Sequence, residues 1–146
     1  MPEPQVIDRS AQQTHAWLRE LAAELGHSDQ RAEYRVLRAV LHTIRDRLPV
    51  DESAQLAAQL PTLLRGVYYE GWRPSTTPAT YRDVDAMLAR VTEEASLAGE
   101  TEASLAVTSV AAVLRRHVSG GELDDVIAVF PTGIRPLLTG EVVEAG

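Results

Sequence analysis

The chain has 146 residues, 45% of them hydrophobic, which is long enough for one domain with a buried core. It contains no cysteine, so disulfides, thiolate metal sites and a cysteine nucleophile are excluded. Its formal net charge of −7 makes nucleic acid an unlikely general partner, because such binders use an excess of cations to neutralise phosphates.

The N-terminal segment predicts neither export nor membrane insertion. Residues 1–5 lack the basic and apolar regions of a secretory signal. No stretch approaches the roughly 18 apolar residues of a membrane span. We therefore expect a cytoplasmic protein with no membrane contact. Residues 1–9 are expected to form a disordered N-terminal tail.

Two helices are predicted next. A capping-box pattern at residues 10–13 precedes apolar residues at helical spacing, and Gly26 is a natural stop for that helix. Ser28 or Asp29 can cap the following helix, which has a wide apolar stripe. Pro49 ends this second and longest helix, because proline lacks the backbone donor that a helix needs.

Two shorter helices complete this half of the chain. Asp51 is expected to cap a helix through Gln59, and Pro61 suits the first position of a helix that runs to about Tyr69. The segment 71–79 has the Pro, Ser and Thr content of a linker.

The second half repeats these signals with different residues. Thr80 and Asp83 resemble a capping box before one helix, and Ser119 and Glu122 form a similar pattern before another. The apolar run 126–130 is the nearest approach to a strand, but it aligns with the helical residues 56–60. We interpret it as a buried helix.

The two halves align at a shift of 70 residues. Residues 37–66 match 107–136 without a gap, and seven further pairs keep apolar character, namely Leu37/Val107, Leu41/Ala111, Ile44/Leu114, Leu48/Val118, Leu56/Val126, Leu60/Phe130 and Leu64/Ile134. The identical pairs are Val40/Val110, Arg45/Arg115, Glu52/Glu122, Ala58/Ala128, Pro61/Pro131, Thr62/Thr132 and Arg65/Arg135. This pattern predicts an all-α protein in which two tandem four-helix units, residues 10–70 and 80–138, pack as one helical bundle-like domain, with a tail over 139–146.

Three motifs carry a resemblance to a known family. They are an Arg-Leu-Pro turn at 47–49, a Gln-Leu-Pro corner at 59–61 and a Tyr-Tyr-Glu-Gly-Trp ending at 68–72. Their order and spacing resemble the bacterial domain-of-unknown-function family 2267 from about Ser10 to Leu138. The resemblance implies an all-helical tandem repeat with no established activity.

The first candidate interaction site is a basic stripe on the long helix. Its members are Arg31, Arg35, Arg38, His42 and Arg45, which fall on one helical face. An anionic partner could dock there, although a solvated outer face that neighbouring acids neutralise is the interpretation we favour. The second half does not repeat the stripe.

The second candidate site is the aromatic group Tyr68, Tyr69 and Trp72. Large rings are favoured as interface anchors because they bury much area at low entropic cost. The favoured alternative is that they pack between the halves and fix the linker. Trp17 is expected to be part of the core.

No catalytic or metal-binding constellation is expected. The four histidines are scattered, and none has the spacing that places two ligands on one helical turn. The adjacent acidic pairs at 93–94 and 124–125 point apart on a helix, and Glu52 and Glu122 sit where negative charge favours a helix start. The sequence contains neither a glycine-rich nucleotide-binding loop nor the Gly-x-Ser-x-Gly motif of hydrolases. We therefore expect that the protein binds no cofactor and is not an enzyme.

These observations predict a non-enzymatic module that binds another protein or itself. The alternative is contact with nucleic acid or the ribosome through Arg31, Arg35, Arg38 and Arg45, since arginines on one helix face can grip phosphates. A third possibility is a small-ligand pocket between the halves.

Overall fold

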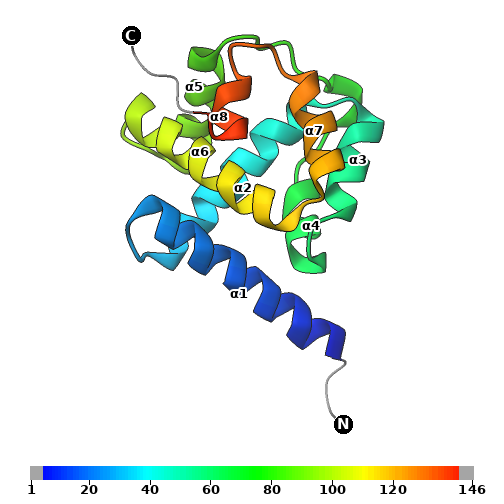
Figure 1. The fold of residues 1–146 in the computed structure, drawn as a ribbon, viewed down its shortest axis with the longest axis vertical. Coiled ribbons are helices and arrows are strands. Elements are labelled where there is room, and N and C mark those ends of the chain that lie inside the picture. Colours follow the sequence, from blue (N-terminus) through cyan, green and yellow to red (C-terminus); the bar gives the residue numbers. More distant parts are fainter. Residues whose placement is uncertain (1–4, 142–146) are drawn as a thin grey trace.

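The computed structural model describes residues 5–141, and over this range every regular element is a helix (Figure 1). The prediction of an all-α protein is therefore confirmed. The elements are α1 (Gln5–Leu25), α2 (Gln30–Arg47), α3 (Val50–Ala58), α4 (Thr62–Tyr69), a 3-10 turn η1 (Pro74–Thr76), α5 (Val84–Ala95), α6 (Glu100–His117), α7 (Gly120–Val129) and α8 (Arg135–Thr139).

The helices α2 and α6 occupy the centre of the molecule, and the other helices cover them. Helix α1 packs on both α2 and α6, and α5 does the same. Helix α4 contacts α2, α8 contacts α6, and α3 and α7 contact each other. The N-terminal end of α1 extends beyond the body of the molecule (Figure 1).

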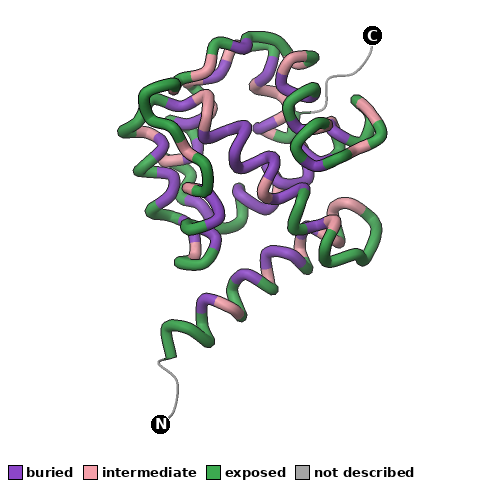
Figure 2. Tube along the Cα trace, turned by 180° about the vertical axis from the view of Figure 1, so that it is seen from behind, coloured by how far each residue is buried: buried purple, intermediate pink, exposed green. Residues whose placement is uncertain are grey.

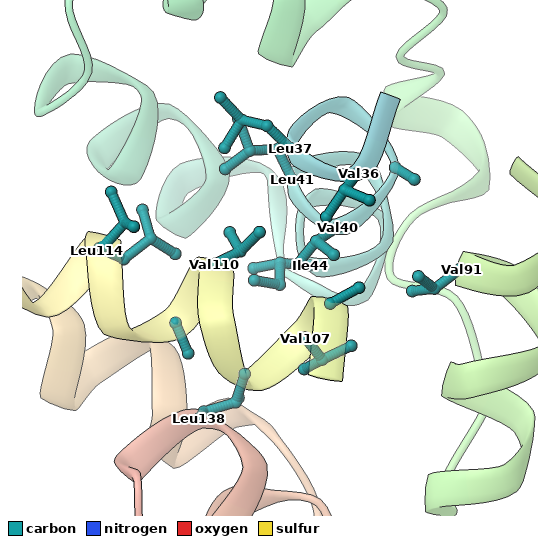
Figure 3. Packing of buried hydrophobic residues seen from close by; sticks show 14 of the residues in the cluster. Val36, Leu37, Val40, Leu41, Ile44, Val91, Val107, Val110, Leu114 and Leu138 are labelled. Atoms are coloured by element: carbon teal, nitrogen blue, oxygen red, sulfur yellow. The ribbon is translucent and has the colours of Figure 1, made fainter. Parts of the chain in front are cut away.

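The core forms where the apolar faces of α2 and α6 meet. Val40 and Ile44 of α2 lie beside Val107 and Val110 of α6, and all four are at most 1% exposed (Figure 3). Each such side chain contributes about 1.5–3 kcal/mol when fully buried. Every residue of α2 from 39 to 45 is buried, so this part of the helix is enclosed on all sides (Figure 2).

Several predicted helix boundaries are confirmed. The Asp29 side chain accepts from the backbone N–H groups of Arg31 and Ala32 and caps α2. Gly26 follows α1 with a positive φ of 79°, which glycine adopts without steric strain. Ser119 caps α7 by accepting from the Glu122 N–H.

The start of α1 differs from the prediction. The helix begins at Gln5 rather than at Ser10, so residues 5–9 are helical and do not form a tail. The Ser10 hydroxyl instead accepts from the Leu63 N–H at 2.8 Å and thereby caps α4 from the side. Residues 1–4 and 142–146, the remainder of the two expected tails, lie outside the described residues.

Other cap assignments were wrong by a few residues. Pro49 precedes α3 as its N-cap, which places Asp51 in the first turn of that helix. Pro61 is likewise the N-cap of α4, and not its first residue. Asp83 caps α5 through the Ala86 N–H without Thr80. The prolines have ψ near 150°, the extended conformation that an N-cap requires.

Within residues 5–141 no single helix is both long and apolar enough to cross a membrane. Helices α5 and α6 are long and apolar enough for a membrane span only when they are taken together, and they are bent by 91° relative to each other.

Replacing Ser10 with Ala tests the side-on cap of α4. We expect a loss of about 1 kcal/mol in the free energy of unfolding, because the Leu63 N–H loses its acceptor. Urea denaturation measures the loss. Gln12→Ala, at an exposed position of the same helix, is the control and should change stability by less than about 0.5 kcal/mol. Equal losses for the two variants would show that the cap contributes nothing.

Candidate functional site

The five members of the predicted basic stripe separate into exposed and buried groups. Arg31 and Arg35 are exposed on the first two turns of α2, and Arg38 is half-buried. His42 and Arg45 are each only 4% exposed. The stripe therefore lies on one helix face, as predicted, but helices α4 and α5 cover its C-terminal part.

Arg45 is an internal cross-link. Its Nη1 donates to the backbone carbonyls of Tyr68 and Glu70 at 2.8 and 2.7 Å, which lie at the C-terminus of α4. Its Nε donates to the Asp46 carboxylate at 2.8 Å. The guanidinium thus satisfies carbonyls that the end of a helix leaves without partners, and its charge is compensated by Asp46.

His42 joins three helices. Its Nδ1 lies 2.6 Å from Glu94 on α5, and its Nε2 lies 2.7 Å from the Val67 carbonyl of α4. Both ring nitrogens therefore have a hydrogen-bond partner on another helix.

Arg38 completes this network at the surface. Its guanidinium contacts Glu94 at 3.2 Å and Glu70 at 3.4 Å. The stripe was predicted to be neutralised by neighbouring acids, and Asp46 does pair with Arg45, but Glu94 and Glu70 were not identified as partners. Glu94 and Glu70 lie 56 and 32 residues from Arg38, and no local pattern relates positions so far apart.

The aromatic group is also largely internal. Tyr68 is fully buried, and its hydroxyl lies 2.7 Å from the Ser53 hydroxyl. Burial raises the pKa of Tyr68 above its usual range. The Tyr69 ring contacts the rings of Tyr68 and Trp72 at centroid distances of 5.4 and 5.2 Å. Tyr69 and Trp72 are half-buried.

Trp17 is buried, as predicted. Its ring stacks on His117, the last residue of α6, with centroids 4.7 Å apart. The His117 Nε2 lies 2.6 Å from Glu20 of α1. This contact fixes α1 to the end of α6.

The exposed part of the stripe borders a groove between α1 and α2. Its volume is about 480 Å³, and it is lined by His15, Leu18, Gln30, Arg31, Tyr34 and Arg35. Gln30 Nε2 lies 3.0 Å from His15 Nδ1, which joins the two helices beside the groove. Tyr34, which sequence reasoning did not single out, is 37% exposed between the two arginines. The sequence did contain a signal for Tyr34, because a residue three positions after Arg31 lies on the same helix face.

This groove has the residue types of a binding surface. Within residues 5–141 neither Arg31 nor Arg35 makes an ion pair, so both guanidinium groups are available to a partner. Tyr34 adds a rigid ring with a polar tip. The arrangement can bind an anionic group beside an apolar one.

A second cluster of titratable groups lies between α3 and α7. Carboxylate oxygens of Glu52, Glu122 and Asp125 all lie within 4.8 Å of one another. Three carboxylates at such a spacing would suit a cation, but no other feature of the cluster indicates a ligand. The convergence of Glu52 and Glu122 was not predicted, because each was interpreted only as favouring a helix start.

Comparison with protein-family models places most of the chain in one family. Residues 14–137 match the model of a family described as "Uncharacterized conserved protein (DUF2267)". No curated protein matches the chain closely enough to count as a relative.

Replacing Arg45 and Arg35 separately with Met tests whether the buried arginine stabilises the fold and the exposed one does not. Arg45→Met should lower the free energy of unfolding by about 3–5 kcal/mol, because it leaves the half-buried Asp46 carboxylate and two carbonyls without their donor. Arg35→Met should change stability by less than about 0.5 kcal/mol. Chemical denaturation of both variants provides the comparison. A similar small effect at both sites would mean that Arg45 is not an internal cross-link.

Proposed function

The chain belongs to the DUF2267 family of uncharacterized conserved proteins, and we propose that it is a non-enzymatic helical module that binds another protein. The family description assigns no activity, so the proposal depends on the surface of this chain. We further propose the bacterial cytoplasm as its setting, which suits a chain without cysteine.

The observation that carries this proposal is the exposed set Arg31, Tyr34 and Arg35 beside the groove between α1 and α2. Tyrosine and arginine are the residue types that most often dominate the energy of protein interfaces. Here they share one helix face, and Leu18 lies in the groove beside them. A partner can therefore bury the Tyr34 ring while its own charged groups contact the two arginines.

The charges favour one kind of partner. Arg31 and Arg35, which make no ion pair within residues 5–141, favour an acidic segment, and the mainly apolar groove favours a segment that also carries an apolar side chain. We propose an acidic, amphipathic segment of another protein as the occupant. A second copy of this chain, which is itself acidic, is the alternative that an oligomerisation assay distinguishes.

We also propose that the chain consists of two tandem four-helix units. Helices α2 and α6 begin and end 70 residues apart. Arg65 and Arg135 make matching contacts, since each donates to carbonyls at the end of the preceding helix, including Ala58 and Ala128 respectively. Packing is reciprocal as well: α1 contacts α6 and α5 contacts α2.

The proposed binding surface belongs to the first unit alone. The positions of the second unit that correspond to Arg31, Tyr34 and Arg35 are Thr101, Ser104 and Leu105. These residues carry no charge. The first unit is therefore the proposed binding unit, and the second completes its core.

Substitutions in the groove test the proposal. We expect Tyr34→Ala to weaken binding of the captured partner by about thirtyfold, which is the roughly 2 kcal/mol typical of an interface anchor. Arg31→Glu with Arg35→Glu should abolish binding by charge reversal. Arg19→Glu with Arg82→Glu makes the same change of charge at exposed positions outside the groove and is the control.

The measurement is affinity capture from an extract of the native cells, followed by calorimetry with the purified partner. Capture that the control retains and the groove variants lose supports the proposal. Capture of nucleic acid instead, with affinity that falls steeply with salt, would replace it with the nucleic-acid alternative. Retention of no protein at all, or equal capture by every variant, would contradict it.

A further inference from the structure

The carboxylate cluster between α3 and α7 brings two glutamates together in a partly enclosed space. Glu52 and Glu122 lie in the first turns of these helices, and both are half-buried. The Oε1 atom of each is buried and has no hydrogen-bond partner among residues 5–141. Asp125, one turn further along α7, brings a third carboxylate to the cluster.

The local hydrogen bonds explain why Glu122 is available for this contact. In a complete capping box its side chain would accept from the Ser119 N–H. That N–H instead donates to Gln59 Oε1 at 3.2 Å, from the end of α3. Only the Ser119 half of the box is formed, and the Glu122 carboxylate lies against Glu52.

This environment disfavours a charge on Glu122. Burial and the negative charges of Glu52 and Asp125 raise the pKa of Glu122 from 4.5 to about 7. Two carboxylates at short range cannot both ionise without strong repulsion. A proton on one of them would remove the repulsion and would supply a hydrogen-bond donor to the other.

The cations on the neighbouring helices are engaged elsewhere. Arg65 of α4 donates to carbonyls at the end of α3, and Arg135 of α8 donates to the Phe130 carbonyl just after α7. On α6, Arg115 donates to the Leu138 carbonyl, Arg116 pairs with Glu20 and Glu24, and His117 contacts Glu20. Asp51 and Asp124 add only further negative charge to α3 and α7. Within residues 5–141 these cations leave the Glu52–Glu122 pair without a salt bridge, so a proton can neutralise it.

We propose that Glu52 and Glu122 share one proton in the folded protein, and that its loss to solvent loosens the contact between α3 and α7. This contact joins the two halves of the chain at their periphery, while α2 and α6 hold the centre. Deprotonation therefore opens the contact locally and leaves the core intact. The device is a pH-sensitive junction that responds near neutrality.

The direction of the pH effect follows from linkage. Glu122 binds its proton more tightly in the folded state than in the unfolded state. The stabilising contribution is therefore complete below pH 4.5 and is lost as the pH rises through about 7. Stability should fall across the range where most surface carboxylates are already ionised.

The experiment combines two measurements on the full chain between pH 4 and 9. Carboxyl-carbon NMR follows the titration of Glu122, and hydrogen exchange, corrected for the intrinsic rate, follows residues 50–58 and 120–129. We expect a Glu122 midpoint near 7 and exchange in both helices that accelerates through the same pH range. Exchange in residues 39–45 of α2 should accelerate much less, because these residues stay folded when the contact opens locally.

Glu52→Gln is the decisive variant. Its amide keeps the shape of the side chain, removes the charge and can donate to an ionised Glu122, so the midpoint should fall toward 4.5 and the accelerated exchange should disappear. Asp124→Asn removes one charge from α7 outside the cluster and is the matched control, which should keep the midpoint of the natural protein.

Three results would overturn the proposal. The first is a Glu122 midpoint near 4.5 in the natural protein. The second is exchange in α3 and α7 that does not follow the titration. The third is a midpoint that falls on addition of Ca²⁺ or Mg²⁺ at constant ionic strength, because a bound cation would then take the place assigned to the proton.

Discussion

Enclosure of two long helices is the constraint on which the rest of the structure depends. Helices α2 and α6 can bury their side chains only if other helices surround them, and α1, α4, α5 and α8 do so. Such coverage would be straightforward for purely apolar helices. Helix α2 is not apolar all round, and its polar face must find partners where water is excluded.

The basic face of α2 meets this requirement in two ways. Toward its C-terminus, Arg45 and His42 are buried and bind the carbonyls of α4 and the carboxylates of Asp46 and Glu94. Toward its N-terminus the covering helices end, and Arg31 and Arg35 remain in water beside Tyr34. One continuous stripe in the sequence thus serves as an internal cross-link at one end and as the candidate binding surface at the other.

The sequence predicted those features that depend on neighbouring residues. Helix periodicity, the Asp29 cap and the Gly26 stop require only local geometry, and the structure confirms them. Features that depend on tertiary contact were missed. Ser10 has the right pattern for a cap of its own helix but caps α4, and Glu122 has the right pattern for a capping box but faces Glu52. In both cases a partner distant in sequence displaced the local one.

The hydrogen bond between the Ser119 N–H and Gln59 has a consequence for the chain as a whole. The first peptide group of α7 depends on a side chain that was translated 60 residues earlier. A fragment that begins at residue 80 would expose this donor to solvent together with the surfaces of α5 and α6 that α1 and α2 cover. The C-terminal half of the chain should therefore fold only after the N-terminal half is present. A C-terminal fragment that is expressed alone should need the N-terminal half in order to fold.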